Sequence, residues 1–197
     1  MAITVDMVKE LRERTGAGVL DCRNALQEVG GDFDKAATLL RKKGLAIAAK
    51  KAEREAKEGL VEAYIHGGGR LGVLLELNCE TDFVARTADF RELAHDLAMQ
   101  IAATNPQYLT PQDIPTDVLE GQRRREREQV EGDKPEEVVE RILEGKLKKY
   151  YQEVCLLEQP FIKDEGVSIR ELMTAKIAKL GENIKVRRFA RFELEGA

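Results

Sequence analysis

Apolar residues near the start of the chain recur at helical spacing, and glycines interrupt the pattern three times. Thr4 can cap a first helix that stops before Gly16, a second run stops at Gly30, and a third stops at Gly44. The apolar positions are Val8 and Leu11; Val19, Cys22, Leu26 and Val29; and Phe33, Ala36, Ala37 and Leu40. The pattern therefore predicts a three-helix module over residues 1–44, followed by an Ala-, Lys- and Glu-rich helical linker over residues 45–58.

The period then changes from that of a helix to that of a strand. Residues 60–66 and 71–79 flank three glycines, and alternate residues of the second run are apolar. One face of that run carries Leu71, Val73, Leu75, Leu77 and Cys79. We expect a β-hairpin, with the helix that Thr87 can cap packed on its apolar face.

The rest of the chain predicts helices and two further strands. Two charged helical segments within residues 116–150, broken at residues 132–135, suggest a helical hairpin. A short apolar run at residues 154–157 predicts a strand, a Ser168 and Glu171 capping box opens a helix to residue 180, and residues 184–194 alternate as a C-terminal strand. In that last strand Val186 and Phe192 fall on one face and Phe189 on the other. The predicted class is α+β, with residues 59–197 forming one core domain.

Charge and composition narrow the range of functions. The net charge is −4, although 35% of residues are charged, which argues against a protein that coats nucleic acid or an anionic membrane. No apolar run reaches the roughly 20 residues that span a bilayer, and the start does not read as a secretion signal. The three cysteines, Cys22, Cys79 and Cys155, are odd in number and widely spaced, which fits a reducing cytoplasm better than a disulfide framework or a zinc site.

Candidate chemistry is sparse. The histidines, His66 and His95, have no nucleophile at a known spacing, so an enzyme would need acid, base or metal partners brought near in space. The glycines at 67–69 lie between two strands and predict a turn, and no phosphate-binding motif or metal-ligand cluster occurs, so no cofactor is expected. Basic clusters at residues 41–43 and 123–125 have acidic neighbours and read as solvated helix faces with ion pairs.

The most informative segment runs from Asn78 to Arg86. It places Phe83 just beyond a strand and before a capped helix, where an aromatic side chain either covers the end of the core or stands exposed as an anchor for a partner. The residues alone leave these two alternatives open.

Two segments resemble the elongation factor Ts family, the guanine-nucleotide exchange factors of the translation GTPase elongation factor Tu. Residues 8–23 read VKELRERTGAGVLDCR and residues 78–84 read NCETDFV, and weaker similarity at residues 159–161 and 181–184 extends the likeness over most of the chain. The resemblance implies a ubiquitin-associated-like N-terminal module, a linker and an α+β core.

The resemblance also implies site residues, all of them for binding. Thr81, Asp82, Phe83 and Val84 would intrude beside the nucleotide site of the GTPase, with Phe83 acting as a wedge that displaces Mg²⁺ and phosphate ligands. Val19, Leu20 and Arg23 would dock elsewhere on its nucleotide-binding domain. Exchange makes and breaks no covalent bond, so no catalytic residue and no cofactor are expected.

One departure from the family matters. Many members have two tandem core subdomains, whereas this chain has residues for one sheet. We therefore expect a homodimer that restores the pair, with Cys155 as a weak candidate for a cross-dimer disulfide.

The alternative function is an adaptor that uses the three-helix module to bind a ubiquitin-like protein or an RNA-associated partner. An adaptor would not need an exposed Phe83.

Overall fold

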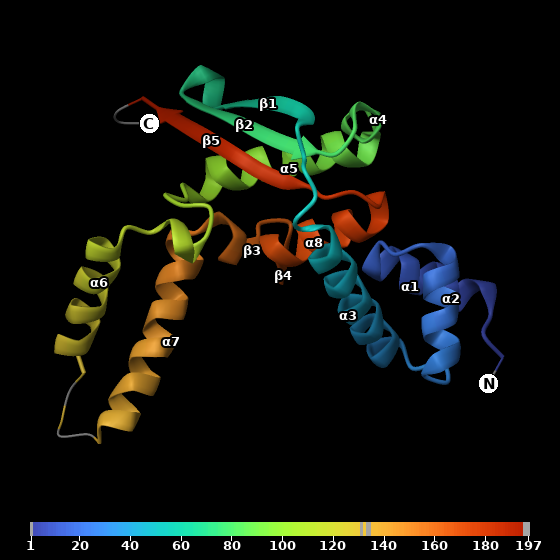
Figure 1. Ribbon diagram of the computed structural model, residues 1–197, viewed down its shortest axis with the longest axis horizontal. Coiled ribbons are helices and arrows are strands. Elements are labelled where there is room, and N and C mark those ends of the chain that lie inside the picture. The colour runs from blue at the N-terminus through green and yellow to red at the C-terminus, as the bar shows by residue number, and fades with distance from the viewer. Residues whose placement is uncertain (1, 131, 133–134, 195–197) are drawn as a thin grey trace.

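The computed structural model describes residues 2–130, 132 and 135–194. A three-stranded antiparallel sheet lies on a layer of helices, a three-helix module stands at one end of the molecule, and a helical hairpin extends at the other (Figure 1). This is the predicted α+β architecture. Within the described residues, no helix combines the length and apolar character needed to cross a membrane.

The N-terminal module consists of α1 (Val5–Thr15), α2 (Val19–Glu28) and α3 (Phe33–Lys51). Thr4 and Asp32 cap α1 and α3 with side-chain oxygens that accept backbone N–H groups, and Gly16 ends α1 in the left-handed conformation. The core of the module is formed by Val8, Leu11, Cys22, Ala25, Leu26, Ala36 and Leu40. These contacts confirm the predicted three-helix packing.

The expected stop at Gly44 is wrong, because α3 continues to Lys51. A glycine ends a helix when it turns left-handed, and Gly44 is not among the residues with positive φ. It is buried against α8 (Ile169–Leu180), where a Cβ atom would lie 3.8 Å from both Thr174 and Ala178. The contact with α8 supports the helix beyond the glycine, so much of the expected linker is an extension of α3.

The sheet has the order β1–β2–β5, with β1 (Glu58–His66), β2 (Leu71–Cys79) and β5 (Lys185–Glu193). The short 3-10 turn Gly67–Gly69 joins β1 to β2 and confirms the predicted hairpin. Its predicted apolar face packs on α5 (Ala88–Thr104) through Val73, Leu75, Leu77 and Cys79, with Phe90, Leu93, Leu97 and Ile101 opposite.

The last strand contains a bulge that the alternation of the sequence did not indicate. Leu77 pairs with Val186, whereas the adjacent Glu76 pairs with Arg188, so one extra residue lies in β5. The face of the strand therefore changes after Val186. Phe189 packs against the core together with Val186, and Phe192 is 68% exposed, so the prediction that Val186 and Phe192 share a face is wrong.

The predicted strand at residues 154–157 is also wrong. Helix α7 (Glu136–Val154) runs into it, Cys155 forms an isolated bridge with Tyr108, and Leu156–Glu158 make a 3-10 turn. Cys155 and Leu156 are buried, so the run is apolar because it enters the core. A small unpredicted hairpin of β3 (Pro160–Phe161) and β4 (Asp164–Ser168) follows it.

The helical hairpin of α6 (Thr116–Glu128) and α7 is confirmed. Of its described side chains only Leu143 is fully buried, and ion pairs join the two helices. They link Arg123 to Glu140, Arg127 to Glu136 and Glu140, and Lys146 to Glu126. The break predicted at residues 132–135 lies partly outside the described residues, since positions 133 and 134 are not described.

Candidate functional site

The 81–84 turn, formed by Thr81, Asp82, Phe83 and Val84, joins the sheet to its covering helix. Strand β2 ends at Cys79, and the short helix α4 (Asp82–Ala85) leads to α5. Thr81 caps α4 by accepting the N–H of Val84 at 3.4 Å, and Thr87 caps α5. The turn is thus supported on both sides by elements that contribute to the core.

Phe83 stands outside the core. Its side chain is 81% exposed, whereas the neighbouring Val84 packs on the core and Ala85 is buried. Of the two alternatives for this aromatic residue, the geometry selects the exposed one. An exposed aromatic ring on a supported helix is a suitable anchor for a protein partner.

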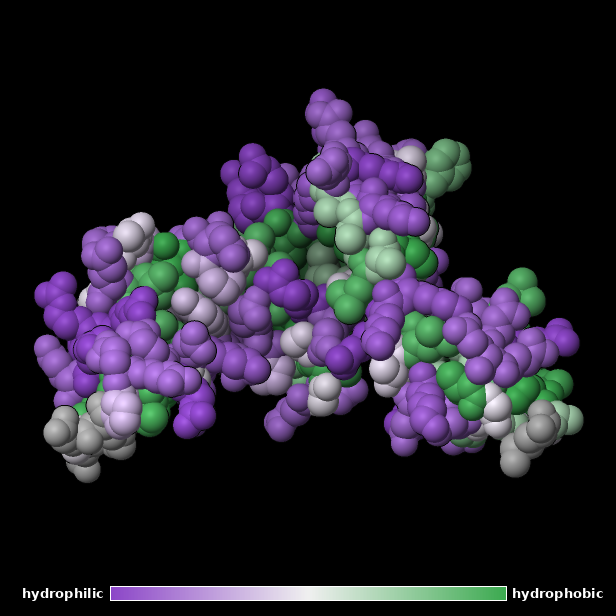
Figure 2. Space-filling view, turned by 60° about the horizontal axis from the view of Figure 1, so that its bottom comes forward, coloured by the Kyte–Doolittle hydropathy of each residue, from purple (hydrophilic) through white to green (hydrophobic). Residues whose placement is uncertain are grey.

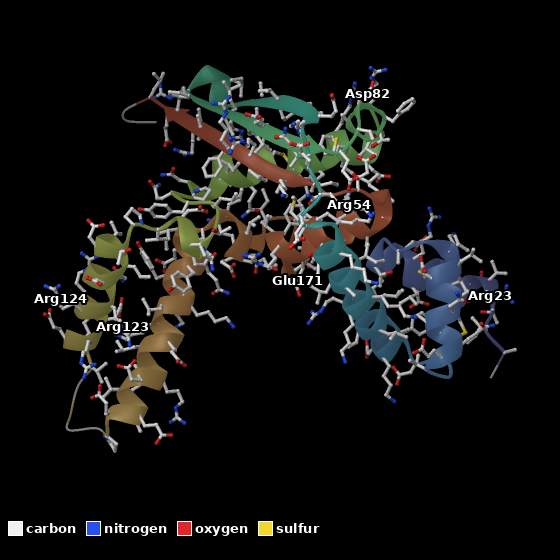
Figure 3. All side chains as sticks on the ribbon, viewed as in Figure 1. Arg23, Arg54, Asp82, Arg123, Arg124 and Glu171 are labelled. Carbon is white, nitrogen blue, oxygen red and sulfur yellow. The ribbon has the colours of Figure 1, made fainter. Side chains whose placement is uncertain are left out.

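Asp82, labelled in Figure 3, precedes Phe83 on α4 and lines a polar groove. Its carboxylate pairs with Arg86 at 2.7 Å and remains about half exposed. The groove has a volume of about 490 Å³ and runs between the start of β1 and α4, lined by residues that include Glu58, Glu62, Asp82, Arg86 and Arg91. The turn therefore presents an aromatic ring next to charges of both signs.

Two residues that the sequence did not single out hold this turn. Glu182 accepts hydrogen bonds from the backbone N–H groups of Glu80 and Thr81, each at 3.0 Å. The N–H of Asn183 donates to Glu80 at 2.6 Å, and this bond, followed by the nearby Arg54, lowers the pKa of Glu80 below its usual value. The likeness to the family at residues 181–184 was the one signal in the sequence that pointed to this contact.

The second predicted contact surface lies on α2 of the N-terminal module. Val19 is 54% and Leu20 70% exposed, and Arg23 is also exposed, all within the first turn and a half of α2. Figure 3 labels Arg23 on this module, and Figure 2 shows apolar residues reaching the surface of the right-hand lobe that the module forms. Both α4 and the module lie toward the same end of the molecule (Figure 1).

The histidines form no recognisable catalytic site. His95 Nδ1, on α5, lies 2.9 Å from Glu62 of β1, and His66 stacks beside Tyr64 at the end of β1. The thiols of Cys22, Cys79 and Cys155 are buried, and Ser168 is engaged in the capping box of α8. Among the described residues, no group of His, Cys, Asp and Glu is arranged to hold a metal ion.

Three residues of the basic clusters form ion pairs with other elements, and Arg125 bonds to Gln122 of its own helix. Arg41 contacts Glu171, Lys43 contacts Glu28, and Arg123 contacts Glu140. The sequence had suggested neighbouring glutamates instead. These pairs join helices to one another, which fits solvated helix faces with ion pairs better than a phosphate track.

Comparison with known proteins shows the family. The model of the family described as "Elongation factor TS" matches residues 34–176. The chain is 59% identical over 194 residues to elongation factor Ts of Thermodesulfovibrio yellowstonii, covering 98% of this chain and 97% of that one. It is 61% identical to that of Carboxydothermus hydrogenoformans (98% and 89% covered) and 57% identical to that of Fervidobacterium nodosum (98% and 99% covered). This chain spans most of the length of each of these relatives. The chain belongs to the elongation factor Ts family, the nucleotide exchange factors of elongation factor Tu.

Proposed function

We propose that the 81–84 turn is the part of this chain that acts on the nucleotide site of elongation factor Tu. The exposure of Phe83, at 81% on a helix fixed between β2 and α5, is the observation that carries this assignment. Phe83 inserts beside the bound GDP, and the movement of the surrounding side chains displaces Mg²⁺ and weakens the phosphate contacts. Asp82 and the polar groove meet the charged groups around that site.

Exchange by this route is a matter of linked binding equilibria. A factor that weakens the binding of nucleotide to the GTPase is itself bound less tightly when nucleotide is present, by the same ratio. GTP then displaces the factor as it binds. No side chain of this chain needs to act as an acid, a base or a nucleophile.

Substitution of Phe83 tests the assignment. Phe83→Ala should lower the affinity for elongation factor Tu by roughly thirtyfold, since the loss of a central aromatic anchor costs about 2 kcal/mol. Release of labelled GDP from elongation factor Tu should slow accordingly, with an unchanged thermal midpoint. Ile162→Ala, at another exposed apolar residue, serves as the control. GDP release at the parental rate, or a lowered thermal midpoint, would show that Phe83 is not the anchor.

A second contact is proposed for the N-terminal module, taken as residues 1–44, with residues 45–58 as linker and residues 59–197 as core. The exposed Val19, Leu20 and Arg23 support it, as does the separate cluster of buried residues within the module. Leu20→Ala should weaken the complex with elongation factor Tu, whereas Val5→Ala, at an 84% exposed residue of α1, should not. Equal affinity of both variants would favour the adaptor function for this module.

We also propose a homodimer formed by the outer face of the sheet. The helices lie on one side of the sheet (Figure 1), and the other side presents Val61, Ile65, Leu74 and Phe192, which are 48–68% exposed. Two copies of this face, related by a two-fold axis, would form a sandwich and bury these side chains.

A cytoplasmic location is proposed from the role of the family in translation.

Light scattering tests the dimer. The parent should have a mass of about 44 kDa, twice that of the 22.1 kDa chain, and Phe192→Asp should shift it to the monomer. Parent protein that scatters as a monomer at micromolar concentration would rule out this interface.

A further inference from the structure

The turn between α8 and β5 contacts the segment that precedes Phe83 through several hydrogen bonds. Glu182 accepts three hydrogen bonds there, from the N–H of Glu80 at 3.0 Å, the N–H of Thr81 at 3.0 Å and the hydroxyl of Thr81 at 2.6 Å. One carboxylate thus binds the backbone and the side chain of the residue that caps α4.

The same turn binds the segment that follows α3. Asn183 is 2% exposed, and its amide group donates to the carbonyl groups of Ala52, at 3.3 Å, and Arg54, at 2.7 Å. Its backbone N–H donates to Glu80, whose other carboxylate oxygen lies 3.4 Å from Arg54. Figure 3 labels Arg54, on the stretch between α3 and β1, and Asp82, on α4. Three segments distant in sequence therefore meet at residues 181–183.

Fewer contacts hold α4 itself. Pairing of β2 with β1 ends at Cys79, whose thiol donates to the carbonyl of Thr81 at 3.1 Å, and of the four residues of α4 Ala85 is buried and Val84 packs on the core. Phe83 is exposed, so packing does not fix the orientation of its side chain. Since a helix of one turn has little stability of its own, its direction depends on how Glu80 and Thr81 are held.

We propose that Glu182 is a positioning residue for nucleotide exchange, holding Thr81 so that α4 presents Phe83 to the GTPase in a single orientation. The proposal rests on the function proposed for the 81–84 turn. A preorganised anchor binds without first losing conformational freedom, so a loosened turn would dock less tightly and displace ligands less effectively.

Substitution of Glu182 separates positioning from folding. Glu182→Ala should lower kcat/KM for stimulated GDP release by about tenfold, because small misplacements of a contact group have effects of this order or larger. Glu182→Gln should recover most of the rate, since its amide oxygen still accepts the two N–H groups and Thr81 can turn its hydroxyl to accept the NH₂ group. Glu165→Ala, at an exposed glutamate of β4, is the matched control. Amide exchange should rise at residues 80–85 in Glu182→Ala and remain unchanged in β2.

A double-mutant cycle with Phe83→Ala shows whether Glu182 acts through Phe83. In the Phe83→Ala background, Glu182→Ala should cause little further loss. An equal loss in both backgrounds, or a parental rate for Glu182→Ala alone, would overturn the proposal while leaving the role of Phe83 intact. A parental rate for Phe83→Ala would instead refute the proposed function itself.

A second pair of variants applies if Glu182→Ala lowers the thermal midpoint. Glu182→Gln keeps an oxygen that accepts the N–H groups of Glu80 and Thr81, and Glu182→Met removes it with little change in size. At a temperature where both variants are folded, exchange should be slower in Glu182→Met than in Glu182→Gln, and equal rates for the two would contradict the positioning role.

Discussion

Arg41 of α3 and Glu171 of α8 lie far apart in the sequence, yet the guanidinium group is 2.9 Å from the carboxylate. The pair joins the N-terminal module to the core, and Gly44 packs against the same helix one turn further along. Lys51 continues the contact by donating a hydrogen bond to the carbonyl of Gly181. The helix that carries the module is therefore fixed along the core, which holds the two proposed contact surfaces at a set separation.

The α3–α8 contact leads to a prediction about Gly44. Gly44→Ala should raise the free energy of unfolding by about 0.5 to 1 kcal/mol, since alanine favours the helix and its Cβ would make ordinary contacts with Thr174 and Ala178. Gly16→Ala should do the opposite, because Gly16 has a φ of 68° at the end of α1. Urea unfolding measures both, and a destabilised Gly44→Ala would mean that α3 and α8 lie closer than the structure shows.

Acid should destabilise the fold through three carboxylates. The pKa of Glu171 is lowered chiefly by the N–H of Ser168, that of Glu80 by the N–H of Asn183, and that of Asp89 by Lys179. A pKa that is lower in the folded state gives stability that is present above the unfolded value and lost as the pH falls through the folded value. Stability should therefore change little from pH 7 to about 5 and fall below about 4.5.

Glu171→Gln should make that fall shallower, when stability is followed by chemical denaturation at a series of pH values. Glu165→Gln, at an exposed site on β4, should leave it unchanged. Identical acid slopes for Glu171→Gln and the parent would show that Glu171 is not one of the responsible groups.

The α6–α7 hairpin should open before the core does. Its helices are joined by exposed ion pairs, and Leu143 is its one fully buried described side chain. Leu143→Ala should cost about 2 to 5 kcal/mol of local stability, so amide exchange should rise throughout α6 and α7. Salt near 1 M should also raise amide exchange in α6 and α7. At that concentration the Debye length is about 3 Å, so the attraction between the exposed charges is weakened. Exchange rising equally in β2 would indicate that the hairpin and the core unfold together.

The three thiols should react slowly in the native protein. Cys22, Cys79 and Cys155 are buried, and burial raises the pKa of Cys79 and of Cys155 to about 11. At pH 8 an aromatic disulfide reagent should modify them only as the fold opens, whereas all three should react at once in denaturant. The same burial argues against Cys155 as a cross-dimer disulfide. A dimer mass that depended on reductant would contradict this conclusion.

Much of this fold follows from local patterns. Helical spacing, capping residues and glycines defined α1, α2, α5 and α8, because an amphipathic stripe and a satisfied helix terminus are properties of neighbouring residues. Alternation and the three glycines defined the β1–β2 hairpin in the same way. The 81–84 turn was located by its place after a strand and by its likeness to the family.

Other features depended on residues that are distant in the sequence. From the sequence, Gly44 predicts the end of a helix, and only its contact with α8 shows why the helix continues. The apolar run at residues 154–157 predicts a strand, and only the structure shows that it follows α7 directly into the core. The bulge in β5 is visible only in its pairing with β2. Gln100 is buried with Gln159 at 3.1 Å, a partner that no periodicity indicates.

For this protein, the sequence by itself determined where the helices and the first hairpin lie and which turn carries the exposed aromatic candidate. Only the tertiary structure decided that Phe83 points outward and that Glu182 holds the turn beneath it. The physical reason is that periodicity reports which face of an element is buried, whereas exposure at a turn and a hydrogen bond to Thr81 depend on how separate elements are placed in space.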